Sequence, residues 1–211
     1  DGGAGAAGPA IVGEDGRPQP SVRGLPTRLA LLHQHTALRF LRVGRAAYAR
    51  YKSPAGCTPP QACDVPVLMG AALAVRGDVV AATGGFDERY FLYFEDADLC
   101  RRIGLAGHAV RFVPAAVVEH AGGASSDPRR GPALLWYLQS LFAHVDHVHG
   151  RAAGLLYRAV FKPLFLVRML TDTVRDAVTW LLRPSKRPDK GPELRLAAWF
   201  AGRGLVAFLA A

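Results

Sequence analysis

The stretch Tyr90–Arg102, YFLYFEDADLCRR, joins aromatic side chains to a cluster of carboxylates and a pair of arginines. Leu99 and Ile103 are one helical turn apart, and Gly107 is a typical helix stop. This spacing predicts a helix from Asp96 to Leu105, preceded by an extended aromatic run. The stretch therefore places its carboxylates at the beginning of a helix.

The three carboxylates have two explanations. Negative charge is favoured at a helix N-terminus, and Asp98 can form an ordinary ion pair with Arg101 or Arg102 on the same helix. Alternatively, Asp96 or Glu95 stays ionised and acts as a general base. In that case the flanking aromatics exclude water and anchor the segment, while the charged side chains face a cleft.

The composition indicates a globular protein with an anionic partner. Half of the 211 residues are hydrophobic, 20% are charged and the formal net charge is +9. This balance suits phosphates, nucleotides, nucleic acid or an acidic membrane surface. A nucleic-acid binder ranks last because no binding motif is recognisable, so we predict no nucleic-acid partner. The chain starts with Asp1 instead of Met, which we interpret as a piece of a longer protein.

The cysteines favour a reducing compartment. Cys57, Cys63 and Cys100 form no CxxC pair, so we expect free thiols in the cytosol, with a Cys57–Cys63 bridge as the alternative. No signal peptide and no run of about 18 apolar residues are visible.

Turn and periodicity signals divide the rest of the chain into short elements. Upstream of the opening stretch we predict a short strand at Ala10–Val12, one or two helices over 28–50, a buried strand over 65–75, and a helix over 77–82 that ends at Gly84. Downstream we predict two strands separated by a proline and three helices, the second kinked at Pro163: strands 109–114 and 116–120, helices 133–148, 151–183 and 193–209.

A resemblance adds to this interpretation. The segment from Met69 to Ser126 closely resembles the C-terminal half of family 2 glycosyltransferases, particularly the bacterial rhamnosyltransferase-like group. The similarity is carried by ordered motifs: the small pair Gly70-Ala71, GGFDE at 84–88, FLYFEDADLCRR at 91–102 and VVEHAGGASS at 117–126. It implies an α/β chain, the C-terminal part of a GT-A fold with an α-helical C-terminal extension.

The resemblance also implies a reaction and its residues. It implies inverting transfer of a sugar, with rhamnose as our guess, from a nucleotide-sugar donor to a hydroxyl of a glycan or polyprenyl-linked acceptor. Asp96 matches the catalytic base, and Glu95 would shape the acceptor side. His120 matches a histidine that helps to hold a divalent metal, Mg²⁺ or Mn²⁺, on the diphosphate. A histidine at a strand end bonded to the backbone is the plain alternative for His120.

Other residues are weaker candidates for acceptor or phosphate binding. The set comprises small residues near the base and polar residues on the predicted helix and the loop beyond it: Gly70, Ala71, Asp98, Arg101, Arg102, Arg129 and Arg130. An exposed helix face explains Arg101 and Arg102 equally well. His144 and His147 share a helix face and could bind a metal, although a polar helix end is more common.

One departure from the family pattern limits the function. The family carries an aspartate-x-aspartate metal motif in its N-terminal half, and this chain has none before Asp96. We therefore predict that residues 1–150 form the acceptor-side part of the transferase domain and that the chain alone transfers no sugar. The alternative is a non-catalytic module of a split or truncated enzyme that binds acceptor or membrane.

The predicted helix over 151–183 suggests a membrane contact, so we assign 151–211 to a membrane-associating extension. A basic stripe suits anionic lipid, and aromatics elsewhere on the helix suit apolar burial. The stripe comprises Arg158, Lys162, Arg168 and Arg175; the aromatics are Tyr157, Phe161, Phe165 and Trp180. We expect a cytoplasmic protein that is peripheral at the inner face of the cell membrane. A packing helix with a solvated face is the alternative.

Overall fold

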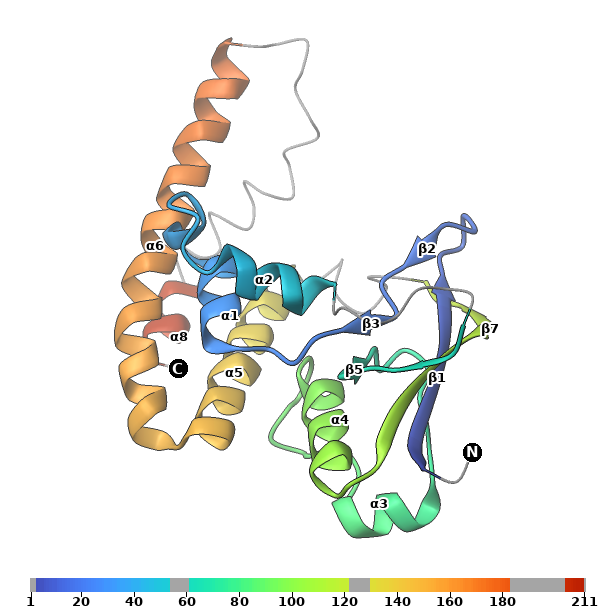
Figure 1. The fold of residues 1–211 in the computed structure, drawn as a ribbon. Helices are drawn as coiled ribbons and strands as arrows, with labels where there is room; N and C mark the ends of the chain where they lie inside the picture. The colour runs from blue at the N-terminus through green and yellow to red at the C-terminus, as the bar shows by residue number, and fades with distance from the viewer. Residues whose placement is uncertain (1–2, 54–60, 122–129, 183–203, 211) are drawn as a thin grey trace.

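The computed structural model describes residues 3–53, 61–121, 130–182 and 204–210. In these ranges the chain is a mixed α/β structure: a twisted sheet with two short helices lies beside a group of longer helices (Figure 1). The predicted α/β class with a helical extension is confirmed. Residues Arg129 and 183–203 lie outside the described ranges, so the loop and most of the last predicted helix are not addressed.

The sheet is built around two parallel strands, β1 (Ala4–Val12) and β7 (Ala109–Glu119). Among the described residues it has five strands. The other three pair antiparallel with β1 or β7: β2 (Pro18–Gln19), β6 (Ala74–Val75) and β4 (Cys63–Asp64). A separate pair is formed by β3 (Val22–Arg23) and β5 (Val67–Leu68). The sheet thereby brings the end of β7 beside the end of β1.

Three strand predictions are wrong in their bounds. β1 begins at Ala4, well before the predicted start at Ala10. Its first residues are small because neighbouring side chains lie close to the backbone: a Cβ on Gly5 would lie 2.6 Å from the Cβ of His108. Packing thus overrides the low strand propensity of Gly and Ala. The region 65–75 is two short strands, because the chain turns at Gly70 and its halves pair with different partners. β7 is one strand in which the register shifts near Pro114, as expected at a bulge.

The helices largely match the predicted periodicity. The first predicted helical region is α1 (Arg28–His35), the 3₁₀ turn η1 (Ala37–Arg39) and α2 (Arg45–Lys52). The helix expected over 77–82 is α3 (Gly77–Thr83), and it ends at Gly84 with φ 80°. The opening stretch gives α4 (Glu95–Leu105), and the helix expected over 133–148 is α5 (Arg130–His149).

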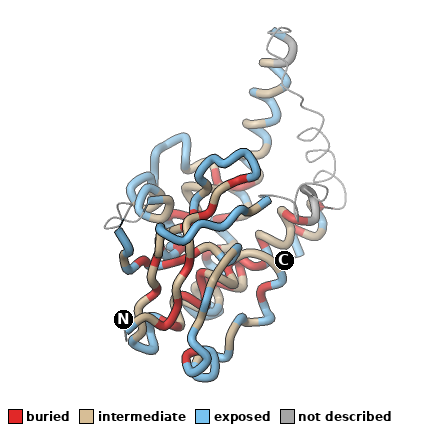
Figure 2. Tube along the Cα trace, turned by 90° about the vertical axis from the view of Figure 1, so that its right-hand side faces the viewer, coloured by how far each residue is buried: buried red, intermediate tan, exposed pale blue. Residues whose placement is uncertain are grey.

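Two hydrophobic clusters hold these elements together, and Figure 2 shows the buried residues that they contribute. The first lies between α4 and the sheet and includes Leu99, Ile103 and Phe112. The second joins α1 and α5 to the C-terminal helices α6 (Arg151–Leu182) and α8 (Leu205–Ala210). This second cluster crosses residue 150. The domain boundary proposed there stays a prediction.

The α6 helix corrects the reasoning about the membrane. Tyr157, Phe161 and Phe165 are buried in the second cluster, so the expectation that Phe161 and Phe165 contact lipid is wrong. Arg158 is paired with Asp146 at 2.7 Å, and Arg168 is paired with Asp172. The packing-helix alternative is therefore correct for this face of α6. Pro163 lies inside α6, which continues beyond it as one helix (Figure 1).

Two further findings concern the cysteines and membrane spans. Cys63 is disulfide-bonded, so the expectation of free cysteines is wrong for this residue, whereas Cys100 is a free, buried thiol. Within the described ranges, no helix combines the length and the apolar character needed to cross a bilayer.

Candidate active site

The turn before α4 places the carboxylate pair. Tyr93 and Phe94 both adopt the left-handed conformation, with φ values of 70° and 69°, which is uncommon for residues other than glycine. Their rings hold this conformation by packing on α5: Tyr93 and Phe94 lie 5.4 and 5.2 Å from the ring of Tyr137. Strained backbone of this kind persists only where the surroundings fix it, and it gathers at functional sites. The aromatics therefore anchor the turn, and the carboxylates follow it.

The Asp96 carboxylate accepts hydrogen bonds from two backbone N–H groups. The N–H of Gly70 donates to its Oδ2 at 3.0 Å, and the N–H of Ala97 donates to its Oδ1 at 2.7 Å. The turn at Gly70 approaches closely, since a Cβ there would lie 3.3 Å from the Cβ of Asp96. Asp96 stays partly accessible, so this carboxylate is fixed in direction and open to a ligand. Gly70, predicted near the base, therefore contacts it directly.

Burial tunes both carboxylates of the pair toward the protonated form. Desolvation raises the pKa of Asp96, while the two backbone hydrogen bonds and the charge of Arg23 oppose the rise. Desolvation also raises the pKa of Glu95, and the nearby charge of Asp96 adds to it. The Oε2 of Glu95 is buried and has no hydrogen-bond partner among the described residues. A carboxylate with a raised pKa is the stronger base, which suits proton abstraction.

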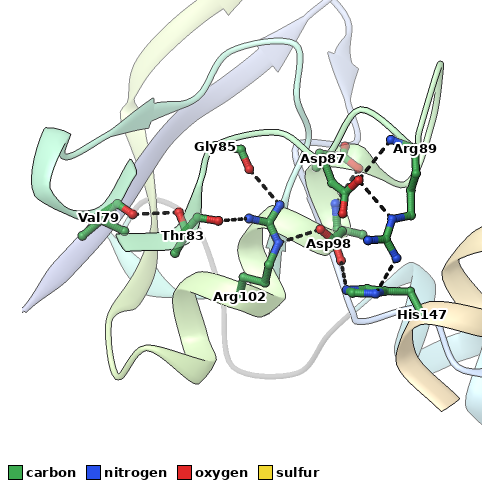
Figure 3. A network of polar contacts seen from close by, with 10 residues as sticks. Val79, Thr83, Gly85, Asp87, Arg89, Asp98, Arg102 and His147 are labelled. Carbon is green, nitrogen blue, oxygen red and sulfur yellow. Dashed lines mark hydrogen bonds and ion pairs between the residues drawn. The ribbon is translucent and has the colours of Figure 1, made fainter. Parts of the chain in front are cut away.

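Asp98 has the opposite environment, although it stands two residues further on. Its side chain is 0% exposed, and its Oδ2 accepts from the Nε of Arg102 at 2.7 Å. The other guanidinium nitrogens of Arg102 donate to the carbonyls of Thr83 and Gly85, at the end of α3 (Figure 3). This network ties α4 to α3. The Oδ1 of Asp98 has no hydrogen-bond partner among the described residues but is buried, and all three guanidinium nitrogens of Arg102 are engaged, so neither side chain offers an accessible group to a phosphate or an acceptor.

A second part of the network reaches α5. Figure 3 shows His147 between Asp98 and Arg89: its Nε2 is 3.7 Å from the Oδ1 of Asp98, and its Nδ1 is 2.6 Å from Arg89. Arg89 also pairs with Asp87 at 3.0 Å. Asp87, Asp98 and His147 have the ligand types and the proximity for a metal ion. The Arg89 guanidinium already occupies Asp87 and His147, so we interpret this group as a structural network.

His144 does not join His147 in a metal site. It is 2% exposed and packs against the rings of Tyr90 and Phe94, at 6.3 and 5.3 Å. Burial lowers the pKa of His144 to about 4, which keeps the imidazole neutral at physiological pH. His144 is therefore a core residue that packs against the aromatic turn.

His120 sits just beyond β7, and two contacts fix its orientation. Its backbone N–H donates to the carbonyl of Val12 at 2.9 Å, and its Nδ1 lies 3.3 Å from the Oε1 of Gln19. The Nε2 of Gln19 donates back to the carbonyl of His120 at 3.1 Å. Since Nδ1 faces an amide oxygen, it carries the proton, and Nε2 keeps its lone pair. Such an orientation fits a metal ligand supported by an outer hydrogen bond.

The remaining predicted residues are spread around the base. Ala71 is exposed in the turn next to Gly70. Arg101 is half buried, and its charge contributes to the lowered pKa values of His144 and His149. Arg130 begins α5, but its side chain, like Arg129, lies outside the described residues. Arg101 therefore lies close enough to α5 for its charge to act on these histidines.

Two residues near the base were missed by the sequence analysis. Arg23 on β3 donates from its Nε to the sulfur of Met69 at 3.1 Å, and its Cζ lies 5.9 Å from the centre of the Tyr51 ring. The charges of Arg23 and Asp96 affect the pKa of Tyr51, which burial raises. No sequence signal marked either residue, since the stretch around Arg23 is typical of an extended loop.

Comparison with known proteins gives consistent results. The profile described as "Glycosyltransferase like family 2" matches residues 19–137, which is more than half of the chain. The N-acetylglucosaminyl-diphospho-decaprenol L-rhamnosyltransferase of Mycobacterium tuberculosis is 38% identical over 117 residues, in both the CDC 1551 and the H37Rv strains. Rhamnosyltransferase WbbL of Escherichia coli K12 is 36% identical over 76 residues.

These similarities cover the relatives only in part. The mycobacterial match spans 56% of this chain and 37% of the relative, and the Escherichia coli match spans 36% and 29%. No solved structure matches the chain. The region of similarity contains the α4 helix and its carboxylates, within the segment that the family profile covers.

Proposed function

The chain belongs to glycosyltransferase-like family 2, and on this premise we propose that it supplies the acceptor-binding side and the catalytic base of an inverting sugar transferase. One observation carries the proposal: Asp96 is fixed by two N–H groups, partly accessible, and has a raised pKa. A general base must be held in direction, and a raised pKa makes a carboxylate a stronger base; Asp96 has both properties.

In the proposed reaction an acceptor hydroxyl attacks the anomeric carbon of a nucleotide-sugar donor. The hydroxyl proton passes to the Asp96 carboxylate as the new carbon–oxygen bond forms. The bond to the nucleoside diphosphate breaks, and its electron pair leaves with that group. Glu95 directly precedes the base and would border the acceptor side.

A divalent ion, Mg²⁺ or Mn²⁺, fits His120. The hydrogen bond from its Nδ1 to Gln19 leaves Nε2 for the ion, and imidazole suits Mn²⁺ better than Mg²⁺. Such an ion supplies charge neutralisation for the leaving diphosphate. Within this chain, His120 would hold the ion and the backbone of Val12 would hold His120.

The identities of the substrates rest on the relatives. Their names describe rhamnosyltransferases, one of them acting on a diphospho-decaprenol sugar. We propose rhamnose as the donor sugar and a glycan or polyprenyl-linked acceptor of the cell envelope. Because no aspartate-x-aspartate motif precedes Asp96, the donor-binding half would have to be supplied from outside these 211 residues. The same absence favours the second candidate, a module that binds acceptor without catalysis.

We also propose peripheral attachment to the inner face of the cell membrane, but through residues other than those predicted. The α6 helix exposes a row of apolar side chains at helical spacing: Leu156, Val160, Val167, Leu170, Val174 and Val178. A row of this kind can enter a bilayer interface. We expect Val167→Ser with Leu170→Ser to reduce sedimentation with anionic vesicles, and Leu105→Ser, an exposed residue of α4, to leave it unchanged. Equal sedimentation would remove the proposal.

The test of the base uses the complete transferase, meaning this chain together with a donor-binding half. We expect Asp96→Asn to lower the transfer rate by about 10² to 10⁴-fold while donor affinity stays the same. Asp15→Asn, in an exposed turn, is the matched control and should keep the full rate. If Asp96→Asn keeps a near-normal rate and Glu95→Gln does not, Glu95 is the base. If no complete transferase shows transfer, the second candidate stands.

A further inference from the structure

An unusual cationic pair lies beside the base, formed by Arg23 and Lys52. Arg23 is on β3, and Lys52 is the last residue of α2. The two charges lie over one ring: the Arg23 Cζ and the Lys52 Nζ are each 5.9 Å from the centre of Tyr51. Lys52 is also 5.7 Å from the ring of Tyr48. The fold therefore places two like charges around one aromatic ring, close enough for the Arg23 charge to act on Lys52.

A close backbone contact brings the pair together. The N–H of Gly24 donates to the carbonyl of Tyr51 at 2.9 Å, which joins the end of α2 to β3 (Figure 1). A Cβ on Gly24 would lie 2.6 Å from the carbonyl oxygen of Arg50, so only glycine permits this approach. The juxtaposition of Arg23 and Lys52 is thus a property of the backbone, not a chance meeting of long side chains.

The pair lacks the compensation that comparable cations have. Two other partly buried arginines of the described ranges do pair with carboxylates, Arg102 with Asp98 and Arg158 with Asp146. Neither Arg23 nor Lys52 has a carboxylate of the described chain within ion-pair distance. Both are partly buried, and burial together with the Arg23 charge lowers the pKa of Lys52. An anion placed between them would relieve this repulsion.

The position of the pair identifies the anion. The sulfur of Met69 accepts from Arg23, and the next residue, Gly70, donates to Asp96. Because the charge of Arg23 also acts on the pKa of Asp96, an anion at Arg23 would sit near the base. An acceptor sugar with its hydroxyl at Asp96 would place its other substituents toward Arg23 and Tyr51, where an aromatic face suits a sugar ring and a guanidinium suits phosphate oxygens.

We propose that Arg23 and Lys52 bind the diphosphate of a lipid-linked acceptor, with Tyr51 beneath it. This rests on the proposed function, which puts the acceptor hydroxyl at Asp96. It also moves the acceptor's phosphate site away from Arg102, which is fully engaged in the network with Asp98. The shared chemistry is a diphosphate, and the donor's nucleoside diphosphate is the other possible source of it.

The test measures binding to the 211-residue chain without any transfer. Isothermal titration would use farnesyl diphosphate, inorganic diphosphate, uridine and thymidine diphosphates, and farnesol. We expect farnesyl and inorganic diphosphate to bind, farnesol not to bind, and both affinities to fall as salt is raised. Arg23→Gln and Lys52→Gln should each weaken binding about tenfold or more. Arg17→Gln, an exposed arginine in a turn, is the matched control and should change nothing.

The outcomes separate this inference from the proposed function. Unchanged affinity in both variants, with melting curves that show folded protein, would overturn the inference. Tighter binding of the nucleoside diphosphates than of farnesyl diphosphate would overturn the acceptor assignment. Because binding needs neither Asp96 nor a donor, diphosphate binding through Arg23 in a protein without transfer would contradict the catalytic proposal alone. In the complete transferase, Arg23→Gln should raise the KM for acceptor more than the KM for donor.

Discussion

Asp96 and Asp98 stand on the same turn of α4 but belong to different regions of the molecule. Asp98 lies inside the polar network of Figure 3, fully buried, with Arg102 as its partner. Asp96 lies at the start of α4, partly accessible, with backbone N–H groups as its partners and a raised pKa. The difference teaches that position in a sequence motif does not fix a role: a buried carboxylate paired with an arginine stabilises the fold, whereas a partly accessible carboxylate held by backbone N–H groups can react.

The two regions also support each other. The Asp98 network fixes α4 against α3 through Arg102, and the aromatic turn fixes the start of α4 against α5. Both sets of contacts hold the helix that carries Asp96. A base must be held within a fraction of an ångström of its productive position, and this requires a rigid support. Substitutions in the Asp98 network should therefore affect mainly the stability of the fold, and substitutions at Asp96 or its contacts mainly the transfer rate.

The largest expected effect comes from breaking the network. Arg102→Ala would leave Asp98 charged, buried and without its guanidinium, which typically costs about 3–5 kcal/mol. We expect the free energy of unfolding, measured by urea denaturation, to fall by that amount. Arg101→Ala on the same helix is the control and should cost about 0.5 kcal/mol or less. Equal losses in the two variants would mean that the Asp98–Arg102 pair contributes nothing special.

The sequence predicted the position and role of Asp96 better than it predicted the polar network around Asp98. Helical spacing located α4, and the family resemblance pointed to Asp96. The same spacing allowed an Asp98–Arg102 pair but could not show that it is buried, because the carbonyl partners of Arg102 come from Thr83 and Gly85 on another element. Burial depends on packing between distant segments, which local patterns do not encode.

Other parts of the site could not be predicted for a related reason. Arg23 reaches the base only because β3 pairs with β5 and Gly24 permits the contact with α2. The aromatics of α6 were predicted to contact lipid because amphipathic spacing does not say which face is covered. In the structure Phe161 packs on Phe142 of α5, with ring centres 5.4 Å apart. Long-range pairing and helix docking decide both cases.

A smaller effect is expected at the contact that aims the base. Gly70→Ala adds a Cβ 3.3 Å from the Cβ of Asp96, so the turn or the carboxylate must shift by a few tenths of an ångström. We expect the transfer rate of the complete transferase to fall about tenfold, since small misplacements of a catalytic group lower rates strongly. The unfolding free energy should change by about 1 kcal/mol or less.

A second glycine, Gly77, provides a matched control for Gly70→Ala. An added Cβ on Gly77, the first residue of α3, would meet no atom within 4 Å. Gly77→Ala should therefore keep the transfer rate, and alanine in a helix can even raise stability slightly. A rate loss in Gly77→Ala as large as that in Gly70→Ala would show that the effect does not arise from the contact with Asp96.

The smallest expected effect tests whether the charge of the Glu95 carboxylate destabilises the folded protein. Burial raises the pKa of Glu95 in the folded protein above its unfolded value, so the folded state binds more protons between the two values. The contribution of Glu95 to stability therefore falls as pH rises through this window, and the full penalty remains at neutral pH.

Glu95→Gln removes the charge. We expect the variant to be more stable than the wild type at pH 7, by up to about 0.5 kcal/mol, and equally stable at pH values below the unfolded pKa. Melting curves of both proteins across this pH range measure the difference, and Glu88→Gln, at an exposed position, should show none. A variant less stable than the wild type at pH 7 would mean that the Glu95 carboxylate has a stabilising partner, and the contrast with the paired Asp98 would disappear.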